Sequence, residues 1–261
     1  MTTLAAHDVV KEYGDEQGVR ALDTVSLAVD EGEFVVVVGP SGCGKSTLLR
    51  LFAGLVEPTA GTITCEGEAV TGPSRERAMV FQQFNLFPWR TALENVTFGL
   101  EMAGVDRAER RERAREALAL VGLDDALDRY PDALSGGMQQ RVGLARALAV
   151  DPGVLLMDEP FGALDARTRT TLQRELLDIW ARDRTTVLFV THDIDEALLL
   201  GDRLLVMLDD PNRVVARLDV PFDRPRSGRD LETTEQFVGL KRRIRAIFRD
   251  DAPEAGADTR A

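Results

Sequence analysis

Cysteine, lysine and long apolar runs are scarce in this chain of 261 residues. The two cysteines, Cys43 and Cys65, match no metal-ligand spacing and build no framework of disulfide bridges. Three of the 32 basic residues are lysine, and 44 acidic residues give a net charge of −12. Because so acidic a surface repels nucleic acid, binding to a phosphate backbone is excluded as the main role, and no nucleic-acid partner is expected.

Membrane-spanning and secretory segments are also missing from the pattern. The longest near-continuous apolar runs, such as FVVVVG at 34–39, fall far short of the roughly 20 residues that a membrane span needs. The N-terminus MTTLAAHDVV lacks a basic start followed by an apolar core, so it is not a secretory signal. We therefore expect a cytoplasmic chain that reaches a membrane only through a partner.

Strand and helix patterns alternate over most of the sequence. Two β-rich stretches, 7–13 and 22–39, are followed by a glycine-rich loop and a helix over 45–53, and more strands follow. Residues 84–151 change to helical character. After Pro152, short β-branched strands alternate with helices expected at 166–182 and 194–200. This pattern favours an α/β fold with a mostly parallel sheet covered on both faces.

The loop GPSGCGKST at 39–47 matches the phosphate-binding pattern G-x-x-x-x-G-K-[ST], between an apolar strand and a helix. Its glycines let backbone N–H groups close around a β-phosphate, Lys45 bridges the β- and γ-phosphates, and the Ser46 hydroxyl ligates Mg²⁺. For Cys43, we favour a role as a small side chain that fills space in the loop over a role in redox control. The expected nucleotide-binding residues are Gly39, Pro40, Ser41, Gly42, Cys43, Gly44, Lys45, Ser46 and Thr47.

VLLMDEP at 154–160 supplies a second half of the site. Asp158 stands at the carboxyl end of a buried strand, where it can hold the water shell of Mg²⁺, and Glu159 can act as general base on the attacking water. Taken alone, this pair of carboxylates is equally consistent with a catalytic site and with an ordinary acidic strand end. Beside a phosphate-binding loop, the catalytic interpretation is favoured.

Three further residues are candidates because of where they stand. Gln82 and His192 end strands, so Gln82 can reach Mg²⁺ and the water, and His192 can contact the γ-phosphate; lone residues of this kind are more often satisfied polar groups. Tyr13 precedes the core strands and can stack on adenine. The predicted catalytic residues are thus Lys45, Gln82, Glu159 and His192, and the predicted metal ligands are Ser46, Gln82 and Asp158.

LSGGMQQR at 134–141 is a second anion-binding device. A serine and two glycines before a helix leave N–H groups and the positive end of the helix dipole facing outward. The chain already has one complete phosphate loop about ninety residues earlier. The sequence therefore raises the question of whose phosphate this second device binds.

The order of GPSGCGKST, FQQ, LSGGMQQR, VLLMDEP, GALD and VTHD over roughly residues 5–220 resembles the ATP-binding subunit of ABC transporters. The resemblance implies a RecA-like P-loop NTPase fold with an N-terminal antiparallel β-subdomain and an inserted helical subdomain. It also implies ATP and Mg²⁺ as cofactors, and two copies that close head to tail. Ser135, Gly136 and Gly137 would then bind the partner's ATP, with Gln139 nearby, and Asp165 would cross the interface.

The implied domain organisation has two parts. Residues 1–224 form the nucleotide-binding domain, with the helical subdomain inserted at about 84–151. Residues 225–261 hold a basic amphipathic helix at 234–249 and an acidic tail at 250–261, which is expected to be disordered.

Three segments narrow the resemblance to importers of nitrate, sulfonates, taurine and bicarbonate. They are LFPWRTALENV, DEPFGALDARTR and FVTHDIDEALLLGDR. Such a subunit works at the cytoplasmic face of the membrane with a permease and, indirectly, a substrate-binding protein. Phe87, Pro88 and Trp89 are the expected permease socket; the alternative is an apolar clamp inside the helical subdomain. The residues after 225 leave no room for the extra β-barrel of sugar-importer ATPases, so we expect that subgroup less.

Other functions stand as alternatives to the importer hypothesis. A soluble ABC ATPase acting on DNA or ribosomes would need a long coiled-coil insertion or a second nucleotide domain, and neither is seen. A P-loop kinase or GTPase would lack the LSGG segment. An exporter ATPase shares the motifs, so the direction of transport depends on the finer resemblance alone.

Overall fold

The structure is a computed structural model that describes residues 2–14, 18–209, 212–226 and 229–250. The predicted acidic tail falls almost wholly outside the described residues. The strands are β1 Thr2–Tyr13, β2 Val19–Asp30, β3 Phe34–Val38, β4 Ala60–Cys65, β5 Glu68–Ala69, β6 Arg77–Val80, β7 Val154–Asp158, β8 Thr186–Thr191, β9 Arg203–Leu208 and β10 Arg213–Asp219. The helices are α1 Lys45–Phe52, α2 Ala92–Met102, α3 Arg107–Leu120, α4 Gly136–Leu148, α5 Ala166–Asp183, α6 Ile194–Leu200, α7 Arg229–Glu232 and α8 Glu235–Asp250.

Two sheets organise the described residues. An antiparallel sheet has the order β2-β1-β4-β5, and a second sheet has the order β10-β9-β3-β8-β7-β6. Strands β9, β3, β8, β7 and β6 of the second sheet are parallel, and β10 adds an antiparallel edge. The predicted P-loop α/β fold with an N-terminal antiparallel sheet is confirmed. Strand β1 begins at Thr2 rather than at residue 7, because Leu4 pairs with Cys65 of β4 and is fully buried.

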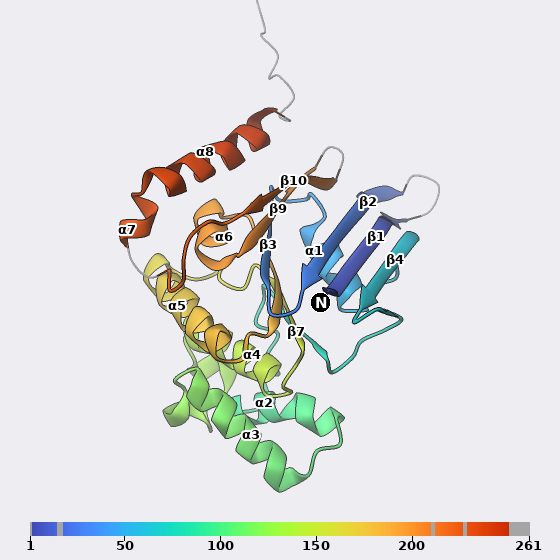
Figure 1. The fold of residues 1–261 in the computed structure, drawn as a ribbon. Coiled ribbons are helices and arrows are strands. Elements are labelled where there is room, and N and C mark those ends of the chain that lie inside the picture. Colours follow the sequence, from blue (N-terminus) through green and yellow to red (C-terminus); the bar gives the residue numbers. More distant parts are fainter. Residues whose placement is uncertain (1, 15–17, 210–211, 227–228, 251–261) are drawn as a thin grey trace, which may run out of the picture.

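Alternate residues of the parallel strands fill two separate cores. Phe34, Val36 and Val38 of β3 face the core that includes α5 and α6, whereas Val35 and Val37 face the core shared with α1 and the antiparallel sheet. Figure 1 shows α1 between the two sheets and α5 and α6 on the opposite face. Because both faces are covered, these strands are continuously apolar rather than alternating, as the sequence pattern predicts.

The helices of residues 92–148 form one end of the molecule. Figure 1 shows α2 and α3 at this end and α8 at the other. Helix α2 begins with a capping box, in which Thr91 Oγ1 accepts from the N–H of Glu94 (3.3 Å) and the N–H of Thr91 donates to the Glu94 carboxylate (2.9 Å). Helix α3 ends before Gly122, whose φ of 66° lies in the left-handed region.

The basic C-terminal helix packs on the core by one apolar face. Phe237 and Ile244 of α8 are buried, and the Phe237 ring stacks on Phe222 with the centroids 5.8 Å apart. Lys241 Nζ binds Asp195 of α6 at 2.6 Å. The helix predicted at 234–249 is therefore present, with bounds one residue later at each end.

The core strands predict one stability experiment. Leu156 of β7 is fully buried, so Leu156→Ala removes apolar contacts and leaves a cavity that the rigid sheet cannot close. We expect urea unfolding to show a loss of about 2–5 kcal/mol. The matched control is Leu55→Ala, because Leu55 is 47% exposed; its loss should stay below about 1 kcal/mol. Equal losses in the two variants would contradict this packing.

Candidate functional site

The candidate site lies at the carboxyl edge of the parallel sheet. In the ladder, Val38 of β3 pairs with Thr191 of β8, and Val190 of β8 pairs with Asp158 of β7. The loops that follow these three strands therefore leave the sheet side by side. The edge so formed carries Gly39, Glu159 and His192, in the position where open α/β sheets bind ligands.

The phosphate-binding loop is shaped by backbone that only glycine tolerates. A Cβ on Gly39 would lie 2.3 Å from the carbonyl oxygen of Met207, and one on Gly44, at φ 95°, would lie 2.2 Å from that of Ala21. Gly42 also has a positive φ, of 93°, but a Cβ there would meet no atom within 4 Å. The loop is therefore tightly packed on its protein side and open at Gly42, as a phosphate cradle requires.

Lys45 lies under this loop with its charge held by oxygen atoms. The side chain is 4% exposed, and Nζ donates to the carbonyl oxygens of Gly39 (2.9 Å) and Pro40 (2.7 Å). Cys43 is fully buried next to it, and burial raises the pKa of the Cys43 thiol. A thiol in this state is a poor nucleophile, which supports the interpretation of Cys43 as loop filler.

The two carboxylates at the end of β7 face different partners. Asp158 Oδ1 accepts from the Ser46 hydroxyl at 2.8 Å, and burial raises the pKa of Asp158. Glu159 Oε2 lies 2.8 Å from Nδ1 of His192, and Glu159 Oε1 lies 3.8 Å from Nζ of Lys45. Glu159 has a φ of 43°, so the chain turns sharply where the sheet ends. The arrangement brings together five predicted residues, Lys45, Ser46, Asp158, Glu159 and His192, from three separate motifs.

A cavity of about 330 Å³ opens over the loop. Its size is that of a small-molecule pocket. The predicted residues that line it are Ser41, Gly42, Gly44, Lys45, Ser46, Thr47, Gln82 and Glu159. The cavity is also lined by four residues that the sequence did not predict: Val19, Arg20, Ala21 and Asn212. They come from the start of β2 and the turn before β10, and no local motif marks them. Asn212 Nδ2 donates to the carbonyl oxygen of Arg20 at 2.7 Å.

Tyr13 is not one of the described residues that line that cavity. It ends β1, is 39% exposed, and has Nζ of Lys11 4.9 Å from its ring centroid. The ring already carries a cation on one side. Its predicted stacking on adenine stays a prediction.

The second glycine device lies at the start of α4. Ser135 caps the helix by accepting from the N–H of Met138 at 3.3 Å, and Gln139 Nε2 donates to the carbonyl oxygens of Pro131 and Leu134. A Cβ on Gly137 would lie 2.6 Å from Thr168 Cγ2 of α5, so glycine is needed there. Ser135, Gly136, Gly137 and Gln139 are absent from the described lining of the cavity over Lys45.

Asp165 caps α5 within its own chain. Its Oδ1 accepts from the N–H groups of Arg167 (3.0 Å) and Thr168 (3.1 Å), and Thr168 Oγ1 donates to Oδ2 at 2.6 Å. These hydrogen bonds, the one from the Thr168 hydroxyl above all, lower the pKa of Asp165. The carboxylate is exposed, so its predicted contact across an interface is sterically open and stays a prediction.

The expected socket residues divide between the two alternatives. Phe87 is half-buried and packs edge-on against Phe98, with the ring centroids 4.6 Å apart, whereas Trp89 is 70% exposed. The fully buried Asn95 pins this turn, because its Oδ1 accepts from the N–H of Phe87 (2.8 Å) and its Nδ2 donates to the carbonyl oxygens of Phe87, Arg90 and Thr91. Phe87 thus packs inside the helical subdomain and Trp89 is exposed at the surface; the permease socket stays a prediction.

These residues fit a magnesium nucleotide. Lys45 offers its charge beside the open side of Gly42, and Ser46 and Asp158 bring a hydroxyl and a carboxylate within 2.8 Å of each other. Hydroxyl, carboxylate and substrate phosphate oxygens are the ligands that Mg²⁺ prefers. Gln82 lines the same cavity as Ser46 and Glu159.

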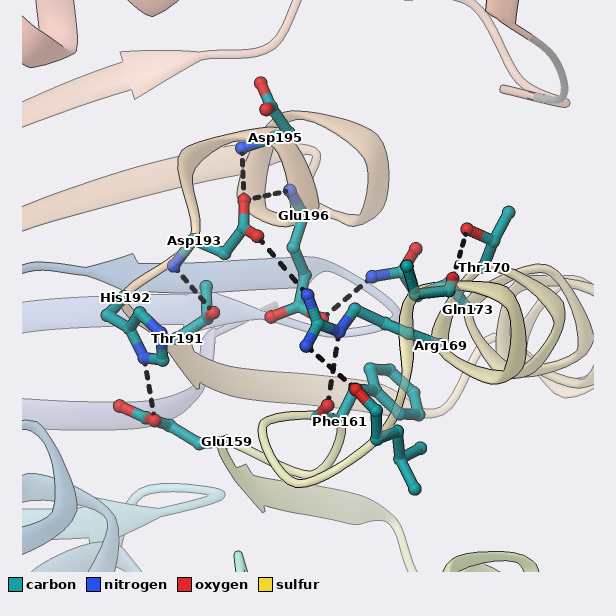
Figure 2. A network of polar contacts seen from close by, with 12 residues as sticks. Glu159, Phe161, Arg169, Thr170, Gln173, Thr191, His192, Asp193, Asp195 and Glu196 are labelled. Carbon is teal, nitrogen blue, oxygen red and sulfur yellow. Dashed lines mark hydrogen bonds and ion pairs between the residues drawn. The ribbon is translucent and has the colours of Figure 1, made fainter. Parts of the chain in front are cut away.

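A buried polar cluster lies behind Glu159. Figure 2 shows Glu196 of α6 pointing back toward α5, where Gln173 Nε2 donates to Glu196 Oε1 at 2.9 Å. Glu196 is 6% exposed, and burial raises its pKa. The sequence contained no signal for this cluster, since Gln173 and Glu196 meet only through the packing of α6 on α5.

The fold and this edge define a P-loop nucleotide-hydrolysing domain, and comparison with known proteins identifies its family. The ABC transporter family matches residues 22–162. A taurine import ATP-binding protein, TauB, of Chromobacterium violaceum is 50% identical over 98% of this chain and 100% of its own. A bicarbonate transport ATP-binding protein, CmpD, of Synechocystis is 49% identical over 85% of this chain and 80% of its own. The chain therefore belongs to the ABC transporter ATPases, as an ATP-binding subunit.

Solved structures agree with that assignment. The dimeric structure of an ABC transporter cassette superposes with a TM-score of 0.76 at 37% identity, over 84% of this chain and 100% of its own. A second dimeric structure of the same cassette, in a post-hydrolysis state bound to ADP and Pi, matches equally well. The fold of this chain is thus that of a cassette ATPase.

Glu196 gives a test of the buried cluster. Burial raises the pKa of Glu196 above its ordinary value of 4.5. The protonated carboxyl therefore stabilises the fold fully below pH 4.5, and this stabilisation is lost as the pH rises through the raised pKa of the folded state. Glu196→Gln keeps the shape and removes the ionisation, so its stability relative to the wild type should increase from pH 5 to pH 8. Urea unfolding at each pH measures this. Glu116→Gln, at an exposed site on α3, controls for the lost charge. If the difference in unfolding free energy between Glu196→Gln and the wild type did not change with pH, burial of an ionisable carboxyl at Glu196 would be refuted.

Proposed function

We propose that this chain is the motor subunit of an ABC importer, in which ATP closes two copies head to tail and hydrolysis reopens them. The observation that carries the proposal is the separation of the two phosphate-binding devices. Lys45 and its loop line the cavity, whereas the helix start at Ser135 is exposed elsewhere in the same chain. A second copy, turned by a two-fold axis, would supply the missing donors. The dimeric cassette structures support this assembly.

The residues of the cavity take distinct roles in this proposal. Lys45 neutralises charge on the β- and γ-phosphates. Ser46, Asp158 and Gln82 would hold Mg²⁺, which neutralises phosphate charge when bound. Glu159 accepts the proton of the attacking water, and His192, 2.8 Å away, orients that carboxylate and contacts the γ-phosphate.

The partner copy contributes the rest of the binding energy. N–H groups of Gly136 and Gly137, at the positive end of α4, would face the γ-phosphate held by the other chain, with Ser135 and Gln139 beside them. Asp165, exposed at the start of α5, would meet the partner directly. Each reaction centre then exists only in the closed dimer.

A permease subunit is the proposed partner of the Phe87–Trp89 turn. Within the described residues no helix is long and apolar enough to span a bilayer. An exposed tryptophan on a turn fixed by Asn95 is the kind of rigid aromatic anchor that dominates interfaces. We place the subunit at the cytoplasmic face of the membrane, with a substrate-binding protein engaged indirectly through the permease.

The proposed substrate is a small anion of the nitrate, sulfonate or taurine class. The support is the importer names among the relatives, which include taurine and bicarbonate ATP-binding proteins at similar identity. This chain contacts nucleotide and permease rather than the transported molecule. The choice within the class therefore belongs to the other subunits.

Replacing Glu159 tests the motor. Glu159→Gln keeps the size of the side chain but removes the base, so ATP should bind and trap a dimer while hydrolysis falls by at least 100-fold, on the order expected for a lost general base. Phosphate release measures turnover, and light scattering with MgATP measures the dimer. Glu116→Gln, at an exposed site on α3, is the control. Full hydrolysis by Glu159→Gln, or by a monomer at any enzyme concentration, would refute the proposal.

Replacing Trp89 tests the partner surface. Trp89→Ala removes a ring that is 70% exposed, so the fold and the hydrolysis rate of the purified chain should persist. The fraction of the chain retained on its native membranes should fall, because losing an aromatic anchor costs about 2 kcal/mol or more, roughly 30-fold in affinity. Met102→Ala, at an equally exposed site on α2, is the matched control. Unchanged membrane retention of Trp89→Ala would place the permease elsewhere.

A further inference from the structure

One arginine connects the two loops that carry the proposed catalytic pair. Glu159 starts the turn between β7 and α5, and His192 starts the turn between β8 and α6. Figure 2 shows Arg169, on the first turn of α5, between them. Its Nε donates to the carbonyl oxygen of Phe161 (3.3 Å) and its Nη2 to that of Leu164 (3.0 Å), while Nη1 lies 4.0 Å from Asp193 Oδ2.

The turn that Arg169 holds joins Glu159 to Asp165. It is closed by two backbone hydrogen bonds, from the N–H of Gly162 to the Glu159 carbonyl (3.1 Å) and from the N–H of Leu164 to the Phe161 carbonyl (3.2 Å). The guanidinium then attaches the middle and the end of the turn to α5. Arg169 therefore adds a side-chain attachment to a turn that its own hydrogen bonds and the buried Phe161 and Leu164 already shape.

The other contact reaches the residue next to His192. Asp193 caps α6 by accepting from the N–H groups of Asp195 (2.8 Å) and Glu196 (3.2 Å), so its carboxylate is fixed relative to the helix. The charge of Arg169 faces that fixed carboxylate. A planar guanidinium directs its donors in several fixed directions at once, which a lysine ammonium on a flexible stem does not do.

Arg169 also closes the space behind the pair. A cavity of about 20 Å³, room for one water molecule, is lined by Glu159, Arg169, His192 and Glu196, among others. A shorter side chain at 169 would enlarge this space and release the turn. Glu159 would then be free to swing away from Nδ1 of His192.

We propose that Arg169 is a positioning residue that sets the geometry of Glu159 against His192, and ties that geometry to Asp165 at the proposed interface. The inference rests on the proposed roles of Glu159 and His192. Arg169 itself has its donors turned to the protein backbone and to Asp193, so it acts through the turn rather than on ATP.

Kinetics of Arg169→Met and Arg169→Lys in the full chain with MgATP test this role. A misplacement of about 1 Å costs roughly 100-fold in rate. We expect kcat of Arg169→Met to fall about 30- to 100-fold, with KM for ATP and the Kd for ADP within about twofold of wild type, because the phosphate loop is untouched. Arg169→Lys keeps the charge without the fork of donors, so we expect about a tenfold loss. Arg174→Met, exposed on the same helix, is the matched control and should keep wild-type kcat.

A double-mutant cycle separates positioning from general damage. If Arg169 acts through Glu159, Arg169→Met should lower the residual single-turnover rate of Glu159→Gln by less than about threefold. The inference would be overturned by any of three results. These are a fully additive loss of rate in the double variant, a wild-type kcat in Arg169→Met, or an equal loss of kcat in Arg174→Met. Where Arg169→Met does not fold, wild-type kcat in Arg169→Lys overturns it, and a tenfold fall at constant KM supports it. Retained hydrolysis in Glu159→Gln refutes the proposed function instead.

Discussion

The parallel pairing of β8 with both β3 and β7 is the constraint on which the site depends. The same register that aligns Val38 with Thr191 and Val190 with Asp158 also divides the strand residues between two apolar cores. A slip of one residue would exchange the faces of every side chain in a strand, so burial on both sides fixes the register firmly. Core packing thereby sets where the phosphate loop, Glu159 and His192 emerge.

Charge is concentrated at this edge in a chain that is acidic as a whole. Lys45 is nearly buried, and carbonyl oxygens rather than a close carboxylate hold its ammonium, since Glu159 Oε1 is 3.8 Å away. Asp158 is buried against a hydroxyl, and its raised pKa reflects that desolvation. A bound divalent cation would favour the ionised form of Asp158. In the proposed function, bound Mg²⁺ would balance the Asp158 carboxylate, and a bound phosphate would balance the Lys45 ammonium.

Sequence reasoning recovered features that are encoded locally. The glycine-rich loop, the strand ending in Asp158 and Glu159, and the helix starts at Ser135 and Asp165 are short patterns whose geometry follows from neighbouring residues. Contacts between distant segments were not recovered. Arg169 against Asp193, Asn95 against the Phe87 turn, and Arg20 beside Asn212 depend on how helices and loops pack, and single residues of these types carry no distinctive spacing. The antiparallel edge strand β10 was also missed, although it pairs with its sequence neighbour β9.

A shared backbone segment links the exposed Trp89 turn with the helix that begins at the LSGG segment. Asn95 fixes the turn that presents Trp89, and Arg146 of α4 donates to the carbonyl oxygens of Asn85 (2.8 Å) and Phe84 (3.2 Å), just after Gln82. Burial lowers the pKa of Arg146, yet a guanidinium stays charged, so these are charge-assisted bonds with little competing water. Helix α4 begins at the LSGG segment. A displacement at the Trp89 turn is consequently opposed by the same helix that would face the partner's ATP, which is the physical connection that coupling of nucleotide closure to a permease requires.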